Sequence, residues 1–348
     1  MNLSILDIRG CAMLDELPKD IYNITHLKIQ REEPLELGPD SDSDVELHLF
    51  DGPPTGNIVR NIRDAKRINL NERESIKSLS YECMRKEGWD GEAMLDALQP
   101  HQNLQKLCIR HYQGLMFPSW MRSQMDTFLP NIIKIKLFSI YDSEDLPVLG
   151  QLPKLEVIVV DNMPKVRRIS DEFCGQRNAA GISFPSLKRL TLTNMWELEE
   201  WVTAVVAGDG ERGTSLFPCL EELCISDCPK LRVRPGIPPS VKTLDLESSV
   251  LPLLTGLDGC QMSLKHLSIN DLEEWISLPE SIRHLSSLET LRIEECESLA
   301  TLPEWLGDLS SLGSLEIRDC PLIDYLPASI RHLTALKTLD ITACSESL

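Results

Sequence analysis

No apolar stretch of the 348-residue sequence approaches the roughly 18 residues that a membrane-spanning helix needs. The tightest apolar run, residues 157–160, has the length of a buried strand. The start of the chain also lacks the basic segment and cleavage site of a secretory signal, because the strand-like residues 3–8 follow Met1 almost at once. These absences predict a cytoplasmic protein without a membrane span.

The sequence also lacks the short motifs that carry common catalytic chemistry. It has no phosphate-binding Gly-x-x-x-x-Gly-Lys-Ser/Thr loop, no zinc-binding His-Glu-x-x-His helix and no Gly-x-Ser-x-Gly nucleophile turn. Adjacent carboxylates are frequent, but acid–base catalysis needs a pocket, which repetitive scaffolds seldom provide. We therefore predict a non-enzymatic chain with no catalytic residues, no cofactor and no metal site.

Basic residues are in the minority. The chain carries 35 lysines and arginines against 54 aspartates and glutamates, and its formal net charge is -19. Binding to nucleic acid depends on a basic surface that neutralises phosphates. This balance excludes nucleic acid as the main partner and favours a protein partner.

What the sequence does contain is an internal repeat. Four phrases begin at Leu264, Leu288, Leu312 and Leu336, each 24 residues after the one before. In every phrase apolar residues occupy the first, fourth and sixth places, and the last two alternate with polar residues. This alternation is typical of a strand with one buried face. Earlier copies of the phrase begin at residues 241, 220, 187, 155, 132, 104, 76 and 3, and weaker matches lie at 65–70 and 45–49.

A single strand of this kind cannot bury its own leucines, whereas a stack of such strands closes a continuous core. We therefore predict an α/β solenoid, a leucine-rich-repeat horseshoe with a parallel β-sheet on its concave face and irregular or short helical convex segments. One domain over residues 1–348 would hold about 12 to 14 repeats. We expect irregular repeats at 1–130, insert loops near 170–183 and 203–215, regular 24-residue repeats at 264–348, and no nucleotide-binding domain. The predicted core includes Leu267, Ile269, Leu291, Ile293, Leu315 and Ile317.

Five of the eleven cysteines occupy the ninth place of the phrase, where the side chain lies under a turn. Small, buried, reduced thiols are expected at such positions. These structural residues are Cys11, Cys228, Cys296, Cys320 and Cys344.

Residues at the third, fifth, seventh and eighth places are predicted to point to the concave face. This face changes from basic to acidic along the chain, and such a gradient can steer a charged partner and set its docking polarity. An ordinary solvated surface is the alternative. The basic partner-binding candidates are Lys106, Arg110, His111, Lys134, Lys136 and Arg189. The acidic partner-binding candidates are Glu222, Asp227, Asp245, Glu247, Asp271, Glu294, Glu295, Glu316, Asp319 and Asp340.

The repeats are similar to those of one family. The cycle Leu-Pro-x-x-Ile-x-x-Leu-x-x-Leu-x-x-Leu-x-Ile-x-x-Cys of residues 278–296 resembles the repeats of plant intracellular nucleotide-binding leucine-rich-repeat disease-resistance proteins. The phrases within residues 56–120 follow in the order typical of the coiled-coil class of that family. The openings Phe184-Pro-Ser-Leu and Phe217-Pro-Cys-Leu add to the resemblance, which covers essentially the whole chain.

The resemblance implies a recognition module of plant innate immunity. In this family the repeats sense a pathogen effector or a guarded host protein, and the early repeats hold the nucleotide-binding module inactive. Because that module and the coiled coil are absent from this chain, we expect a truncated or repeat-only form. Two alternatives remain open: a general cytosolic scaffold or substrate adaptor, and a non-functional fragment.

Overall fold

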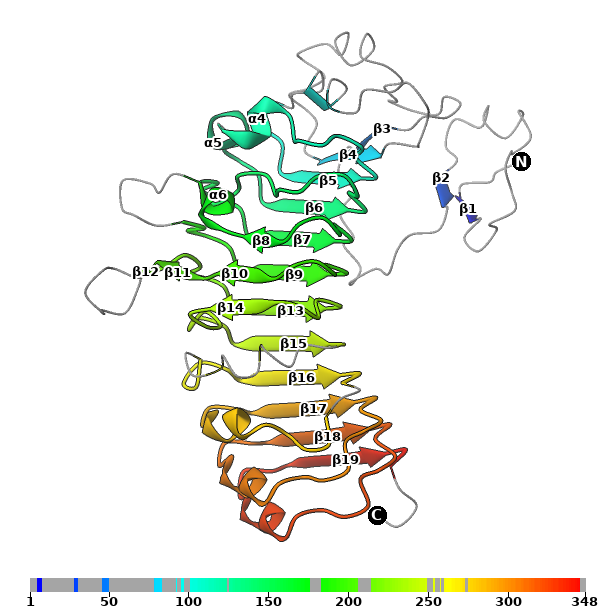
Figure 1. The fold of residues 1–348 in the computed structure, drawn as a ribbon, viewed down its shortest axis with the longest axis vertical. Helices are drawn as coiled ribbons and strands as arrows, with labels where there is room; N and C mark the ends of the chain where they lie inside the picture. The colour runs from blue at the N-terminus through cyan, green and yellow to red at the C-terminus, as the bar shows by residue number, and fades with distance from the viewer. Residues whose placement is uncertain are drawn as a thin grey trace.

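The computed structural model is an elongated stack of repeats along a twelve-stranded sheet (Figure 1). The structure describes residues 101–123, 125–175, 183–205, 214–248, 260–272 and 275–344. It also describes the strand segments 5–7, 28–30, 46–49 and 78–82, and the isolated residues 92, 95, 96, 253 and 257.

The strands of the main sheet are all parallel and follow one another in chain order. From β4 onward each strand covers the third to seventh places of its phrase, as the sequence predicted. Equal places pair between repeats, so that Leu291 faces Leu315 and Ile293 faces Ile317. The strands are β3 (Glu46–Leu49), β4 (Ser78–Glu82), β5 (Lys106–Arg110), β6 (Lys134–Phe138), β7 (Val157–Asp161), β9 (Arg189–Thr193), β13 (Glu222–Ser226), β15 (Thr243–Glu247), β16 (His266–Asn270), β17 (Thr290–Glu294), β18 (Ser314–Arg318) and β19 (Thr338–Thr342).

The core lies directly under this sheet and continues from repeat to repeat. The six predicted core residues, from Leu267 to Ile317, are each at most 1% exposed. A shift of one residue in strand pairing would turn these side chains to the solvent, because successive side chains of a strand point to opposite faces. The apolar places therefore determine the register as well as the core, and both predictions are confirmed.

The chain leaves each strand through a left-handed turn. Ten strands, from β5 to β19, are followed at the eighth place by a residue with φ near +50°. Asp and Asn tolerate this backbone region better than most other residues with a side chain. The amide at this place donates to the next repeat, as Asp319 does to the carbonyl of Thr342 at 3.0 Å. The turn thus extends the hydrogen-bonded ladder beyond the strands.

Short 3-10 helices form the return path of the regular repeats, which confirms the predicted helical convex segments. They are η3 (Glu280–His284), η4 (Glu304–Asp308) and η5 (Ala328–His332), and each begins directly after the proline of a Leu-Pro pair. The Glu304 carboxylate accepts hydrogen bonds from the amides of Ala328 and Ser329 at 3.2 and 3.0 Å. Gly307 allows η4 and η5 to approach closely, since a Cβ there would lie 2.4 Å from the carbonyl oxygen of Ser329.

The earlier return segments differ from this pattern. Helices α4 (Ser119–Arg122), α5 (Met125–Phe128) and α6 (Asp171–Cys174) occur there, together with a second parallel sheet that the sequence analysis did not predict. This sheet contains β8 (Arg168–Ile169), β10 (Glu200–Val202) and β14 (Arg232–Arg234). Aromatic rings fill the core near it. Phe184 stacks on Phe217 at 4.9 Å between centroids, and Trp201 meets Phe217 edge-on at 5.2 Å.

The two expected inserts and the N-terminal repeats are described only in part. Strands β11 (Ala204–Val205) and β12 (Thr214–Ser215) pair antiparallel within the 203–215 insert. Strand β1 (Ile5–Asp7) follows the phrase that begins at residue 3, and it pairs with β2 (Lys28–Gln30). Strand β2 was not predicted, although residues 24, 27 and 29 are apolar at the first, fourth and sixth places. The expected match at 65–70 lies outside the described residues.

Three of the ninth-place cysteines are buried. Cys228, Cys296 and Cys320 are at most 1% exposed, Cys344 is half-buried, and all four are free thiols. Each S–H donates to the carbonyl two residues earlier, for example from Cys320 to Arg318 at 3.2 Å. Burial raises the pKa of Cys228 to about 12, which keeps this thiol neutral. Cys11 lies outside the described residues.

Leu291→Ala tests the core. We expect the free energy of unfolding to fall by about 2–5 kcal/mol, because the substitution leaves a cavity between tightly packed repeats. Urea denaturation followed by circular dichroism measures the loss. The matched control is Leu322→Ala, since Leu322 is 54% exposed and surface changes usually cost less than about 0.5 kcal/mol. Equal losses in both variants would contradict the register.

A thiol titration tests the state of the cysteines. In urea without a reductant, all eleven cysteines should react with a chromogenic disulfide reagent. In the native protein the exposed Cys219 should react quickly, whereas the buried Cys228 and Cys320 should react only as the protein unfolds. A denatured count well below eleven would mean that disulfides are present.

Candidate interaction surface

Side chains at the third, fifth and seventh places of β5–β19 form what we call the open face of the sheet. They are half-buried or exposed at most positions. The fourth and sixth places are buried from β5 to β18, whereas Leu339 and Ile341 of the last strand, β19, are more exposed. Of the sixteen predicted binding candidates, eleven belong to this face and five to the turns at the ends of its strands, and they therefore share one surface. The opposite side of the sheet packs on the core and offers no such surface.

The open face of β5, β6, β7 and β9, with its adjoining turns, is its basic half. Lys106 of β5 pairs in register with Lys134 of β6, and Cys108 of β5 pairs with Lys136 of β6. The Arg110 guanidinium lies 4.6 Å from the ring centroid of Phe138. These strands carry five basic side chains, including Arg189, against the single acidic side chain of Asp161, a net of four positive charges.

One ion pair joins the predicted basic candidates to the predicted acidic candidates. Arg189 at the third place of β9 contacts Glu222 at the third place of β13, with which it pairs in register. Both side chains are about half exposed, and such pairs are individually worth less than about 1 kcal/mol. The boundary between the two predicted patches is therefore a direct contact between them.

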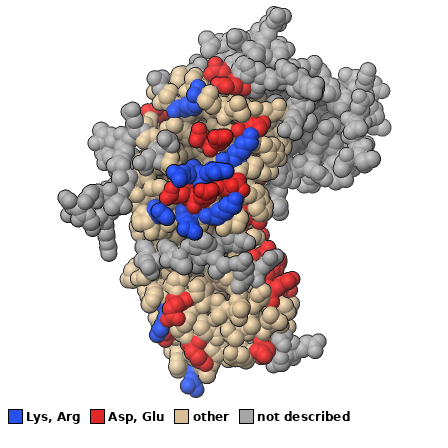
Figure 2. All heavy atoms as spheres, viewed as in Figure 1, with Lys and Arg blue, Asp and Glu red and all other residues tan. Residues whose placement is uncertain are grey.

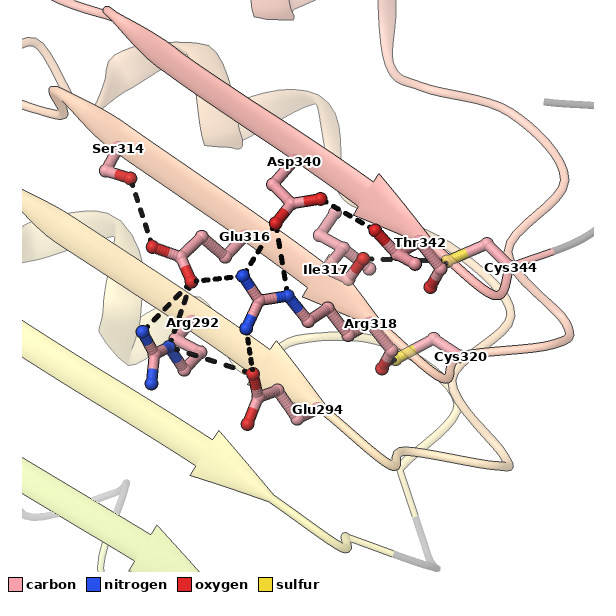
Figure 3. Close-up of polar contacts among 10 residues, drawn as sticks. All are labelled: Arg292, Glu294, Ser314, Glu316, Ile317, Arg318, Cys320, Asp340, Thr342 and Cys344. Carbon is pink, nitrogen blue, oxygen red and sulfur yellow. Dashed lines mark hydrogen bonds and ion pairs between the residues drawn. The ribbon is translucent and has the colours of Figure 1, made fainter.

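The acidic half extends over β15–β19 and contains two arginines that the sequence analysis did not select. Arg318 donates to Asp340 at 2.6 Å and to Glu294 at 3.0 Å, and Arg292 donates to Glu316 at 3.1 Å (Figure 3). The sequence pattern that selected the other candidates also applies to these arginines, because Arg318 occupies the seventh place of its phrase and Arg292 the fifth place. With eight acidic side chains and two arginines, this half keeps a net of six negative charges.

Hydrogen bonds favour the charged form of Asp340 in this network. Those from Arg318, and a further one from the Thr342 hydroxyl at 2.7 Å, lower the pKa of Asp340. Arg318 also lies 3.3 Å from Glu316, so one guanidinium contacts carboxylates from three successive strands. The network connects β17, β18 and β19 across the open face.

Five of the predicted candidates have a backbone role in addition to their charge. His111, Asp227, Asp271, Glu295 and Asp319 are eighth-place residues with left-handed backbones. Their amides extend the ladder between repeats. In Asp271 the carboxylate also accepts a hydrogen bond from the hydroxyl of Ser248 in the preceding repeat at 3.0 Å. These candidates lie at the end of each strand, beside the open face.

A second charged surface surrounds β8, β10 and β14, and the sequence analysis missed it. Figure 2 shows basic and acidic side chains there in alternating bands. Successive repeats contribute rows of charged side chains that alternate in sign. In the sequence these rows are visible as clusters of like charges that recur one repeat apart. The rows are Asp142, Glu144 and Asp145; Lys165, Arg167 and Arg168; Glu197, Glu199 and Glu200; and Lys230, Arg232 and Arg234.

These charge rows pair with each other. Lys165 lies 3.1 Å from Asp142, and Lys230 lies 2.6 Å from Glu197. Glu200 is 3.8 Å from Arg168 and 3.7 Å from Arg234, the repeats on either side. The rows therefore serve contacts between repeats, whereas the open face presents unbalanced charge.

In the described part of the chain, the His, Cys, Asp and Glu side chains include no group of three or more arranged to hold a metal ion. None of its helices has the length and hydrophobicity needed to cross a membrane.

The repeat geometry defines the chain as a leucine-rich-repeat protein. Residues 56–163 match the family model described as R13L1/DRL21 LRRs. A putative disease resistance protein of Arabidopsis thaliana is 32% identical over 202 residues, which cover 57% of this chain and 13% of the relative. Putative disease resistance protein RGA1 of Solanum bulbocastanum is 32% identical over 227 residues, or 64% of this chain and 21% of the relative.

The repeats of this chain are thus related to those of plant disease resistance proteins, as the sequence predicted. The chain matches about a fifth or less of the length of these relatives. Among solved structures, the leucine-rich-repeat domain of the type III effector XopL has a TM-score of 0.42 and 17% identity, with 71% of each chain covered.

Arg318→Gln tests the network. The lowered pKa of Asp340 means that its ion pair stabilises the fold above the ordinary carboxyl pKa and is lost as the pH falls through the lowered value. The variant should therefore be less stable than the parent near pH 7, and the difference should shrink as the pH falls below the ordinary carboxyl pKa of about 3.9. Thermal unfolding across this range measures it. Arg331→Gln, outside the network, should show a small difference at every pH, and a pH-independent loss in Arg318→Gln would exclude the pairing.

Proposed function

We propose that this chain is a recognition module of plant innate immunity that binds a pathogen effector or a host protein through its open face. The relationship to plant disease resistance proteins supports this proposal. The observation that carries it is the charge separation on the open face, with a net of four positive charges over β5–β9 and six negative charges over β15–β19. We place this activity in the cytoplasm and assign the chain no catalytic role.

We further propose that the basic half docks an acidic surface of a nucleotide-binding module supplied by a related receptor. Lys106 and Lys134 pair in register, and Lys136 lies on the same strand as Lys134, so their charges add over a small area. Exposed ion pairs are individually weak and sensitive to salt. Several of them acting together raise the association rate and determine orientation. The acidic half would remain available for a different ligand.

The double variant Lys134→Glu/Lys136→Glu tests this docking. Because two attractive charges become repulsive, we expect the dissociation constant for a nucleotide-binding module of the coiled-coil class to rise about tenfold or more at low salt. Pull-down followed by biolayer interferometry measures the change. The matched control Lys154→Glu/Lys337→Glu alters the net charge equally at two lysines outside the open face. If both double variants bind like the parent, the docking proposal fails.

A further inference from the structure

Two large aromatic side chains lie exposed where the chain leaves the sheet. The side chains belong to Tyr141, which is 43% exposed, and Trp196, which is 48% exposed. Both occupy the tenth place of their repeats, directly after the fully buried Ile140 and Met195. Exposed Trp and Tyr are the residue types that contribute most to binding energy in protein interfaces.

The two aromatic residues leave the sheet from equivalent points. The preceding turn residues, Ser139 and Asn194, have φ values of 53° and 54°. The amides of both donate to the next repeat, at 2.9 and 3.1 Å. The repeat between them has Pro164 at its tenth place, and the repeat after Trp196 has Pro229 there. We call the line Tyr141, Pro164, Trp196 and Pro229 the aromatic rim.

The spacing along the rim matches one regular backbone structure. Tyr141 and Trp196 follow β6 and β9, which are separated by the single strand β7. Neighbouring strands lie about 4.8 Å apart, so equivalent points two strands apart are separated by about 9.6 Å. A polyproline II helix advances about 9.3 Å in one turn of three residues. Prolines at positions i and i+3 of such a helix would therefore meet the two rings in turn.

The rim also offers hydrogen-bond donors. A polyproline II helix has no internal hydrogen bonds, so its carbonyl groups accept hydrogen bonds from a binding partner. The Asn162 side-chain amide donates to the Tyr141 hydroxyl oxygen at 3.3 Å. This contact leaves the Tyr141 hydroxyl hydrogen to donate elsewhere, and the indole N–H of Trp196 is a second donor.

The charges around the rim indicate the composition of the ligand. Beside the rings the acidic groups are already paired, Asp142 with Lys165 at 3.1 Å and Glu197 with Lys230 at 2.6 Å. The surface beside Tyr141 and Trp196 therefore favours uncharged ligand side chains such as the ring of proline. Three residues before Tyr141, at the end of β6, Phe138 belongs to the basic half of the open face, and the Arg110 guanidinium lies 4.6 Å from its ring centroid. Charge complementarity there favours acidic residues next to the prolines.

We propose that the aromatic rim binds a proline-rich segment of a partner protein in the polyproline II conformation. Two prolines one turn apart contact Tyr141 and Trp196, and acidic residues next to them face Arg110. The inference rests on the proposed recognition function in one respect, that the ligand is a protein, and it adds a second surface and a class of ligand to that function. Aromatic side chains that grip prolines are a general mode of peptide recognition.

Fluorescence anisotropy with the full chain tests the proposal. The probes are a labelled peptide of about ten prolines ending in two aspartates, its uncharged counterpart without aspartates, and a glycine–serine peptide ending in two aspartates. We expect saturable binding of both proline peptides, tighter for the acidic one, and none of the glycine–serine peptide. Trp196→Ala and Tyr141→Ala should each weaken binding about tenfold. The matched control Tyr325→Ala removes a residue that is 52% exposed in another repeat, and binding should not change.

Two outcomes would overturn the proposal. One is equal binding of the glycine–serine peptide, which would reduce the effect to charge on the open face. The other is unchanged binding by Trp196→Ala in a variant whose thermal unfolding matches the parent. Lys134→Glu/Lys136→Glu separates this inference from the docking of a nucleotide-binding module. It should leave binding of the uncharged proline peptide unchanged, even where docking of the module is lost.

Discussion

The whole structure depends on the burial of leucine between strands that cannot bury it alone. A five-residue strand such as β17 has two inward side chains, Leu291 and Ile293, and these reach full burial only because β16 and β18 present the same places on either side. Stability is therefore shared between neighbouring repeats, as expected for a solenoid. The same requirement keeps the pairing in register, since a slip by one residue would expose every inward leucine.

Strict register has a consequence for the surface, because it aligns equal places of successive repeats in rows. Arg318 contacts carboxylates of Glu294, Glu316 and Asp340, because all of them occupy fifth or seventh places on its own strand or on a neighbouring strand. On the side of the smaller sheet the same alignment produces acidic and basic rows that pair between repeats. A charge placed at one position of a repeat thus meets its counterpart at nearly the same position of the next.

Binding by such a scaffold depends on the net charge and the exposed apolar side chains that the rows do not neutralise or bury. The rows around β8, β10 and β14 neutralise each other, whereas the two halves of the open face keep net charges of opposite sign. The aromatic rim also presents exposed apolar surface, because Tyr141 and Trp196 remain exposed although the residues directly before them are buried. A partner that meets both surfaces would be oriented by charge and held by contact with the rings.

The sequence by itself determined the strands, their register, the buried leucines and the buried ninth-place cysteines. These follow from apolar residues at the first, fourth and sixth places, a local pattern that each repeat carries in full. Only the tertiary structure decided the arginine contacts of the acidic half, the sheet of β8, β10 and β14, and the neighbours of the exposed rings. The pairing of β1 with β2 was decided there as well, because β2 carries the phrase but was not recognised. The physical reason is that these features depend on which repeats become neighbours across segments of unequal length, and a count of places within one repeat does not contain that information.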